Sequence, residues 1–221
     1  EHALALLLAL SRKVAFYHQQ TKSGQYELQA GPTLRRIEGQ TLGVVGLGNI
    51  GGCLAKKAVA LGLNVLATTR SDRPMPDGVR RCNLDTLLAE SDYVSLHVPV
   101  VPETRHMIGA DQFARMKPTA YLINTARGGL VDQAALATAV ADGQLAGAGL
   151  DVQDPEPPPN LDEPPWNDPR VIVTPHAAFV SEESLTNLRS RTARQVATWL
   201  SGSRPEHVVN PIVLDDPPSS V

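Results

Sequence analysis

Aromatic residues are scarce in this chain, since Phe, Trp and Tyr together make up 4% of its 221 residues. A core with so few rings has to be built mainly from Leu, Val, Ala and Ile. Long apolar runs are lacking as well, and none approaches the roughly 20 residues that span a bilayer. The apolar stretch of residues 3–10 is followed by Arg12 and Lys13, whereas a signal peptide carries its positive charges ahead of its apolar run. We therefore expect neither a membrane span nor a signal peptide.

Cysteine and net charge are also low. The two cysteines, Cys53 and Cys82, have no metal or redox spacing, which favours reduced thiols in a reducing compartment such as the cytoplasm. The formal net charge of −3 gives no reason to expect a nucleic acid or a membrane as a partner. With 42% apolar and 19% charged residues, the composition is that of an ordinary globular protein.

Short apolar runs alternate with stretches of helical periodicity through the middle of the chain. We expect strands at residues 41–46, 64–68, 93–98, 120–124, 146–152 and 171–174, and helices at 49–61, 84–90, 111–117 and 132–142. Fully apolar strands separated by helices predict a parallel sheet covered by helices on both faces. The expected fold class is therefore α/β, with a doubly wound parallel sheet.

The flanking segments differ from this pattern. The first turns of an expected helix at residues 1–20 are apolar nearly all round, which is typical of a helix buried against another domain or subunit. Residues 20–40 and the proline-rich, acidic stretch 154–169 are expected as loops. A final helix follows at 181–200 with Ser181 as its N-cap. The predicted organisation is a contact helix at 1–20, a main domain at 21–178, a C-terminal helix segment at 179–210 and a loose tail at 211–221.

A glycine-rich turn follows the first expected strand and opens the next helix. Gly46 allows the tight turn, Gly48 lets the backbone approach a pyrophosphate, and Gly51 lets helix and strand pack closely. The N–H groups and the positive dipole end of the helix N-terminus favour bound phosphates. With strands before and after at the expected distances, the motif predicts a dinucleotide site in a Rossmann-type fold.

The end of the second strand bears on the choice of dinucleotide. An acid that grips the ribose 2′-hydroxyl is expected there, but the sequence has Thr69 followed by Arg70. A hydroxyl and a guanidinium favour a 2′-phosphate, which a carboxylate would repel. The sequence therefore favours NADP over NAD. The alternative is that Arg70 lies over the adenine and both cofactors bind. Asp72 also stands close to the expected position of the acid, which weakens the argument for NADP.

Taken together, the motifs resemble the D-isomer-specific 2-hydroxyacid dehydrogenase family. The resemblance rests on runs that occur in the family's order: Gly46 to Gly51, Ser95 to Pro99 with Glu103 and Thr104, Ile123 to Asp132, Gly147 to Val152, Asp154 to Pro157, and Thr174 to Ala178. Within the family, the runs His176 to Glu182 and Val208 to Pro211 look most like the branch related to C-terminal-binding proteins.

The resemblance implies three catalytic residues. Arg127 would bind the carboxylate and the carbonyl oxygen of the substrate, for which a planar guanidinium is well suited. His176 would be the general acid for reduction and the base for oxidation, because histidine titrates near neutral pH. Glu156 would pair with His176, orient its ring and favour its charged form. Without the resemblance, each has an ordinary reading as a capping or surface residue.

The resemblance also implies residues that contact the cofactor. Asn49 and Ile50 would present backbone to the pyrophosphate, and Thr104 would reach a phosphate. Val98 and Pro99 would line the adenine or nicotinamide ribose, and Thr125 would lie under the nicotinamide. Asp151 would accept a hydrogen bond from the nicotinamide carboxamide, its ordinary reading being a solvated acid at a strand end. His97 is expected only to pack near the cleft.

Family members begin with a separate substrate-binding lobe, of which this chain has almost nothing. The chain starts at the helix that bridges the lobes, and the helix at 181–200 would cross back to the second lobe. The main hypothesis is an oxidoreductase that moves hydride between NAD(P)H and a small 2-oxo or 2-hydroxy acid, with the glyoxylate or hydroxypyruvate reductase type as one candidate. The alternatives are a nucleotide-sensing interaction module of the corepressor type and a non-catalytic fragment. The apolar first helix also suggests a homodimer.

Overall fold

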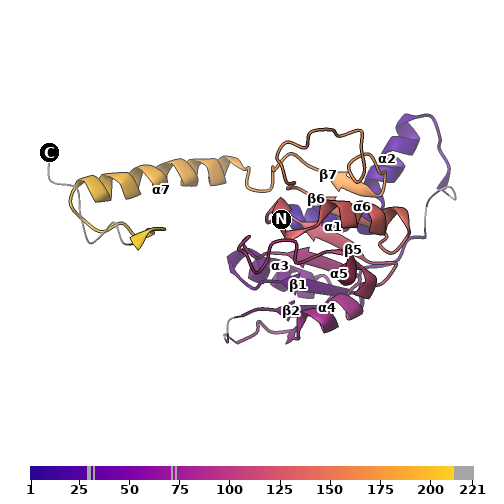
Figure 1. Ribbon diagram of the computed structural model, residues 1–221, viewed down its shortest axis with the longest axis horizontal. Coiled ribbons are helices and arrows are strands. Elements are labelled where there is room, and N and C mark those ends of the chain that lie inside the picture. Colours follow the sequence, from indigo (N-terminus) through magenta and orange to yellow (C-terminus); the bar gives the residue numbers. More distant parts are fainter. Residues whose placement is uncertain (29–30, 32, 71, 73, 212–221) are drawn as a thin grey trace. The chain divides into compact units, whose positions relative to one another are not determined.

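The computed structural model describes residues 1–28, 31, 33–70, 72 and 74–211 (Figure 1). These divide into two compact units, the first spanning Glu1–Ala178 and the second beginning at Phe179. Most of the tail expected at 211–221 lies outside the described residues. Among those described, no helix has the length and apolar character that crossing a bilayer requires.

A seven-stranded, fully parallel sheet forms the first unit, in the order β3-β2-β1-β4-β5-β6-β7. The strands are β1 Thr41–Val45, β2 Asn64–Thr68, β3 Val79–Arg81, β4 Tyr93–Leu96, β5 Tyr121–Asn124, β6 Gly147–Leu150 and β7 Val171–Val173. The order runs outward in both directions from β1, so the predicted doubly wound α/β fold is confirmed. The sequence did not reveal β3, a short edge strand in which only Val79 is buried.

Helices cover both faces of this sheet. They are α1 His2–Ser11, α3 Asn49–Ala60, α4 Leu84–Glu90, α5 Ala110–Arg115 and α6 Gln133–Ala141, with a short 3-10 turn at Gly128–Leu130. The remaining helix of the first unit, α2 Val14–Lys22, has no buried residue. Buried residues of α1 and α3 share one core with the sheet, and buried residues of α4, α5 and α6 share another. Aliphatic side chains dominate both cores, as the shortage of rings predicts.

The stretch expected as one helix at residues 1–20 is two helices, so that prediction is wrong. The chain breaks at Lys13, which adopts a left-handed conformation with φ 55° between α1 and α2. The Lys13 ammonium lies 4.4 Å from the centroid of the Tyr121 ring and also contacts the Tyr121 hydroxyl. A tertiary contact therefore accompanies the break, and no proline or glycine in the local sequence marks it.

The apolar surface of α1 is buried within the first unit itself. Leu6, Leu7 and Leu10 belong to its core, and the side chains of Leu6 and Leu10 lie so close to Gly149 of β6 that a Cβ there would be 3.0 Å from Leu6 Cβ. Packing within the first unit therefore accounts for the apolar composition of α1, and no contact with another domain or subunit is needed to explain it.

The second unit contains α7 (Glu182–Leu200). The Ser181 side chain accepts a hydrogen bond from Ser184 N at 3.0 Å, and Ser184 Oγ accepts one from Ser181 N at 2.8 Å. The predicted N-cap is thus confirmed. None of the α7 side chains is buried.

Candidate active site at the carboxyl edge of the sheet

The glycine turn connects β1 to α3 as the motif predicts. Gly46 has φ 97°, and a Cβ added to it would stand 2.6 Å from the carbonyl oxygen of His97. A Cβ on Gly51 would stand 2.0 Å from the carbonyl oxygen of Gly46. On Gly48, by contrast, a Cβ would meet none of the described atoms within 4 Å, so this backbone faces open space. The turn therefore fits a pyrophosphate lying at the N-terminus of α3.

A cleft of about 680 Å³ opens beside this turn, a size typical of ligand sites. It contains seven of the predicted cofactor residues, namely Gly46, Gly48, Thr69, Arg70, Val98, Pro99 and Thr104. Its apolar side is formed by residues that the sequence analysis did not assign to the site, among them Met75, Pro76 and Met107. Parallel strands end at this edge of the sheet, where doubly wound folds bind their ligands.

Thr104 is held within its own loop. Its hydroxyl donates to Pro99 O at 2.7 Å and accepts from Val101 N at 2.8 Å. The hydroxyl therefore shapes the loop that forms one wall of the cleft, and in this arrangement its single hydrogen is used internally.

His97 lines this cleft and also the adjoining one, so it lies between the two. Its Nε2 is 2.8 Å from Ser95 Oγ. Burial lowers the pKa of His97 to about 4, so that the ring is neutral at physiological pH. From the sequence, His97 was expected only to pack near the cleft, and its place directly after β4 was the one indication that it lies between the two clefts.

The adjoining cleft, of about 370 Å³, contains Arg127 together with Ile50 and Thr125. Arg127 follows β5 and is exposed, with Nη1 donating to Ala126 O at 2.6 Å. The buried amide of Asn124 fixes this turn, since its Nδ2 donates to Arg127 O at 2.9 Å and its Oδ1 accepts from Ala126 N at 3.0 Å. Asn124 is thus a supporting residue that the sequence did not single out.

The turn after β5 packs directly against the loop after β6. A Cβ on Gly128 would stand 2.0 Å from the backbone of Gln153, so only glycine fits there. The same loop carries Glu156, whose Oε1 accepts from Gln153 N at 2.8 Å. Gly128 therefore lets the segments that carry Arg127 and Glu156 lie side by side.

Glu156 and His176 are in direct contact. The Nδ1 atom of His176 lies 2.7 Å from Oε2 of Glu156, and the two side chains are 40% and 33% exposed. A carboxylate at this distance fixes the orientation of an imidazole ring and its tautomer. The sequence predicted this pair through the family resemblance alone.

His176 stands in a strained turn supported by Asp151. It has φ 52°, and its N–H donates to Asp151 O at 2.8 Å. The Asp151 side chain is 0% exposed, and it accepts from the backbone N–H groups of Ala177 and Ala178, both at 2.8 Å. The reading of Asp151 as a solvated acid is therefore wrong, because its carboxylate holds the turn that carries His176.

Topology brings the predicted catalytic residues to one edge of the sheet. Arg127 follows β5, Glu156 follows β6 and His176 follows β7, and these three parallel strands are neighbours. Their carboxyl ends share the edge at which β1 delivers the glycine turn. Glu156 and His176 are not among the residues that line the two clefts described above.

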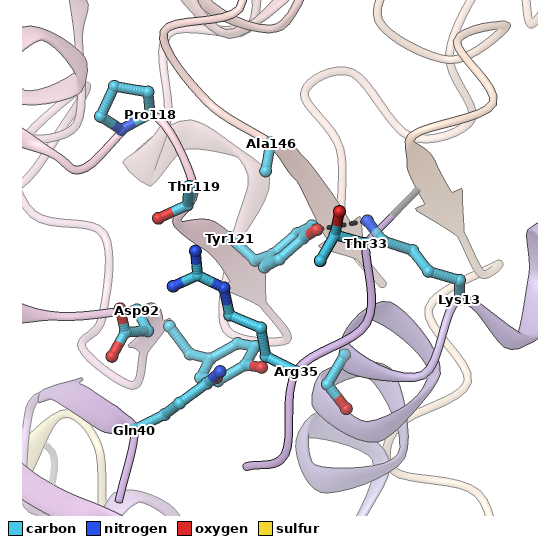
Figure 2. A pocket seen from close by; sticks show the side chains of 11 residues that line it. Lys13, Thr33, Arg35, Gln40, Asp92, Pro118, Thr119, Tyr121 and Ala146 are labelled. Carbon is cyan, nitrogen blue, oxygen red and sulfur yellow. Dashed lines mark hydrogen bonds between the residues drawn. The ribbon is translucent and has the colours of Figure 1, made fainter. Parts of the chain in front are cut away.

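Another pocket, of about 310 Å³, lies at the opposite, amino edge of the sheet (Figure 2). Its lining contains none of the predicted site residues. Lys13 there contacts Tyr121, and Asp92 accepts from Lys117 Nζ at 2.9 Å and from Thr41 N at 2.8 Å. These groups already have internal partners, which favours a structural role for this edge.

The parallel sheet and the glycine turn with its cleft define the first unit as a dinucleotide-binding domain. The family model described as the NAD binding domain of D-isomer specific 2-hydroxyacid dehydrogenases matches residues 4–178. The chain therefore belongs to the D-isomer specific 2-hydroxyacid dehydrogenase family, and the resemblance seen in the sequence is confirmed.

Individual relatives agree with this assignment. A glyoxylate reductase of Korarchaeum cryptofilum is 40% identical over 220 residues, covering 97% of this chain and 66% of the relative. The structure of a D-isomer specific 2-hydroxyacid dehydrogenase from Lactobacillus delbrueckii ssp. bulgaricus, in an NAD complexed form, matches with a TM-score of 0.85 at 34% identity, covering 94% of this chain and 68% of that one. An acyclic imino acid reductase in complex with NADPH matches with a TM-score of 0.85 at 29% identity, covering 95% and 66%. This chain thus spans about two thirds of the length of these proteins.

Proposed function

We propose that this chain is the nucleotide-binding part of an oxidoreductase that interconverts a small 2-oxo acid and the corresponding D-2-hydroxy acid. The observation that carries the proposal is the 2.7 Å contact between His176 and Glu156 at the edge where the glycine turn lies. The similarity to a glyoxylate reductase makes glyoxylate the first substrate to test.

The proposed roles follow from the chemistry of each group. The bound nicotinamide supplies or accepts the hydride. Arg127 binds the substrate carboxylate and the carbonyl oxygen through its guanidinium fork. Because Nδ1 of His176 is held by Glu156, the proton that the substrate oxygen gains during reduction comes from Nε2. The negative charge of Glu156 stabilises the imidazolium before this transfer.

We propose NADP as the preferred dinucleotide, with NAD as the alternative. Thr69 and Arg70 line the cleft at the end of β2, where an acid would select a free ribose hydroxyl. Asp72 has a fully exposed side chain and lies 3.8 Å from Arg81. Similar structures carry NAD in one case and NADPH in another, so both fit this type of domain.

Backbone groups complete the proposed cofactor site. Asn49 and Ile50 begin α3, where N–H groups lack partners within the helix and are available to phosphate oxygens. Thr125 and Ile50 line the cleft that also holds Arg127, which supports their placement beside the nicotinamide. Asp151 is proposed to accept from the nicotinamide carboxamide in addition to the N–H groups of Ala177 and Ala178.

We further propose that α7 crosses to a substrate-binding lobe. The large apolar side chains of Leu188, Val196 and Leu200 are exposed on this helix. Burial of such a row against another part of the protein would stabilise the helix by removing apolar surface from water. Replacing Leu188 and Val196 by serine is expected to abolish turnover while leaving nucleotide affinity unchanged.

We also propose a homodimer. The apolar residues of α1, which suggested a dimer in the sequence, are buried within the first unit, so the proposal depends on other residues. Val14, Tyr26 and Leu28, in α2 and the segment after it, are large apolar residues that are exposed on the first unit. Sedimentation velocity should show a dimer that dissociates when Tyr26 and Leu28 are both replaced by serine. A monomer at high protein concentration would contradict this proposal.

Turnover with defined substrates tests the proposed function. NADPH and NADH oxidation is measured with glyoxylate, hydroxypyruvate and pyruvate, and nucleotide binding is measured separately by titration calorimetry. We expect turnover that is lost in His176→Ala and retained in His18→Ala, a control at an exposed histidine of α2. Nucleotide binding without turnover would favour the interaction module or the non-catalytic fragment.

A further inference from the structure

A histidine at the start of α1 contacts the end of the sheet that carries His176. Nε2 of His2 lies 2.9 Å from Oγ1 of Thr174, a residue 172 positions away, and 3.4 Å from Oδ1 of Asp151. Its side chain is 27% exposed. The helix reaches this edge because Leu6 and Leu10 pack on Gly149, which has no side chain to hold them off.

Hydrogen-bond accounting fixes the direction of this contact. The Thr174 hydroxyl has one hydrogen and donates it to Oδ1 of Asp151. The same oxygen can then only accept from His2, so Nε2 of His2 carries a hydrogen. A chain of donors thus runs from His2 through Thr174 to the Asp151 carboxylate. Both the neutral Nε2–H tautomer and the imidazolium of His2 carry the hydrogen that this chain requires.

The acceptor at the end of this chain holds the turn that presents His176. Asp151 is fully buried, and such a carboxylate needs several donors to remain charged. Besides Thr174, its donors are the N–H groups of Ala177 and Ala178. These two bonds accompany the φ of 52° at His176, a conformation that residues with a Cβ rarely adopt.

We propose that His2 is a positioning residue for His176, acting through Thr174 and Asp151. The proposal rests on the proposed function, because His176 matters for turnover only if it transfers the proton. The donor from His2 polarises the Thr174 hydroxyl, strengthens its bond to Asp151 and so keeps the turn in the strained form. α1 is therefore part of the support for the site, in addition to its role in the core.

Substitutions at His2 separate hydrogen bonding from helix packing. His2→Leu removes the donor and keeps an apolar side chain, whereas His2→Gln keeps an N–H donor without the ring. We expect His2→Leu to lower kcat by about tenfold to a hundredfold, because the proton donor His176 is misplaced. His2→Gln should restore most of kcat, and His18→Leu is the matched control on α2.

A spectroscopic measurement decides the inference without turnover. The amide protons of Ala177 and Ala178 should be shifted downfield in the NMR spectrum because they donate to a carboxylate. We expect His2→Leu to move both resonances and His2→Gln and His18→Leu to leave them in place. If the unmodified protein shows no turnover, the proposed function fails, and these resonances still test the role of His2.

Two results would overturn the inference. One is His2→Leu with unchanged amide resonances in a folded protein. The other is a His2→Gln variant whose kcat falls as far as that of His2→Leu. Should His2→Leu not fold, Thr174→Val removes the hydroxyl at nearly constant volume and Thr174→Ser keeps it. The valine variant is expected to move both amide resonances and the serine variant to leave them in place, and equal behaviour of the two would contradict the proposed chain.

Discussion

The two oxygens of the Glu156 carboxylate have different partners: Oε2 lies 2.7 Å from Nδ1 of His176, while Oε1 accepts from Gln153 N at 2.8 Å. The second bond anchors the carboxylate to the backbone of the loop after β6. Glu156 therefore cannot follow every motion of the imidazole, and the ring is held in one orientation. A proton donor gains from this because little reorganisation is needed when it reacts.

Glu156→Gln tests the charge of this pair. The amide keeps the shape and one acceptor but does not stabilise the imidazolium, so kcat for reduction is expected to fall by about tenfold to a hundredfold. KM for the dinucleotide should stay unchanged in steady-state assays. The control is Glu163→Gln in the loop before β7, which should behave like the unmodified protein.

Arg127→Lys tests the guanidinium fork. A lysine keeps the positive charge but loses the bidentate geometry, so kcat/KM for the 2-oxo acid should fall by about one to two orders of magnitude. Dinucleotide affinity, measured by calorimetry, is expected to stay constant. Arg115→Lys is the matched control, since Arg115 pairs with Asp85 away from the clefts. Equal kinetics for Arg127→Lys and Arg115→Lys would remove Arg127 from the site.

Arg70→Asp tests the choice of dinucleotide. A carboxylate at the end of β2 would repel a 2′-phosphate, so preference should move from NADPH toward NADH by about one to a few kcal/mol. Binding of both nucleotides is measured by calorimetry. Arg35→Asp makes the same change at the opposite edge of the sheet (Figure 2) and should leave the preference unaltered. Unchanged preference in Arg70→Asp would remove the argument for NADP.

Two neighbouring glycines of α3 should respond in opposite ways to alanine. A Cβ on Gly51 would clash with Gly46 O at 2.0 Å, so Gly51→Ala is expected to lower the free energy of unfolding by about 1–3 kcal/mol. A Cβ on Gly52 would meet none of the described atoms within 4 Å, so Gly52→Ala should raise it by about 0.5–1 kcal/mol. Urea denaturation of both variants provides the comparison, and similar effects in the two would contradict the close packing at Gly51.

His97 makes stability depend on pH. Burial lowers its pKa to about 4 in the folded protein, whereas the unfolded chain has the ordinary value of about 6.5. Between these values the unfolded chain binds a proton that the folded protein does not, so the free energy of unfolding falls as pH decreases from about 6.5 to about 4. Urea denaturation across this range should show a shallower decline in His97→Asn than in the unmodified protein, while His18→Asn should match the unmodified protein.

The sequence alone determined the features that depend on short stretches of chain. The glycine spacing from Gly46 to Gly51 and the Ser181 N-cap act over a few residues. Strands that are apolar on both faces mark a parallel sheet between helices, and the strand that the sequence did not reveal, β3, is short and largely exposed. Local propensity and hydrophobic pattern suffice for such features, because the physical causes lie within the segment itself.

Tertiary structure decided which side chains meet. Nothing in the local sequence marks the break at Lys13, which accompanies a contact with Tyr121. The contact of Glu156 with His176 spans 20 positions and that of His2 with Thr174 spans 172. Such pairs form because parallel strands deliver distant segments to one edge of the sheet, and the hydrogen-bond partners there depend on packing in three dimensions.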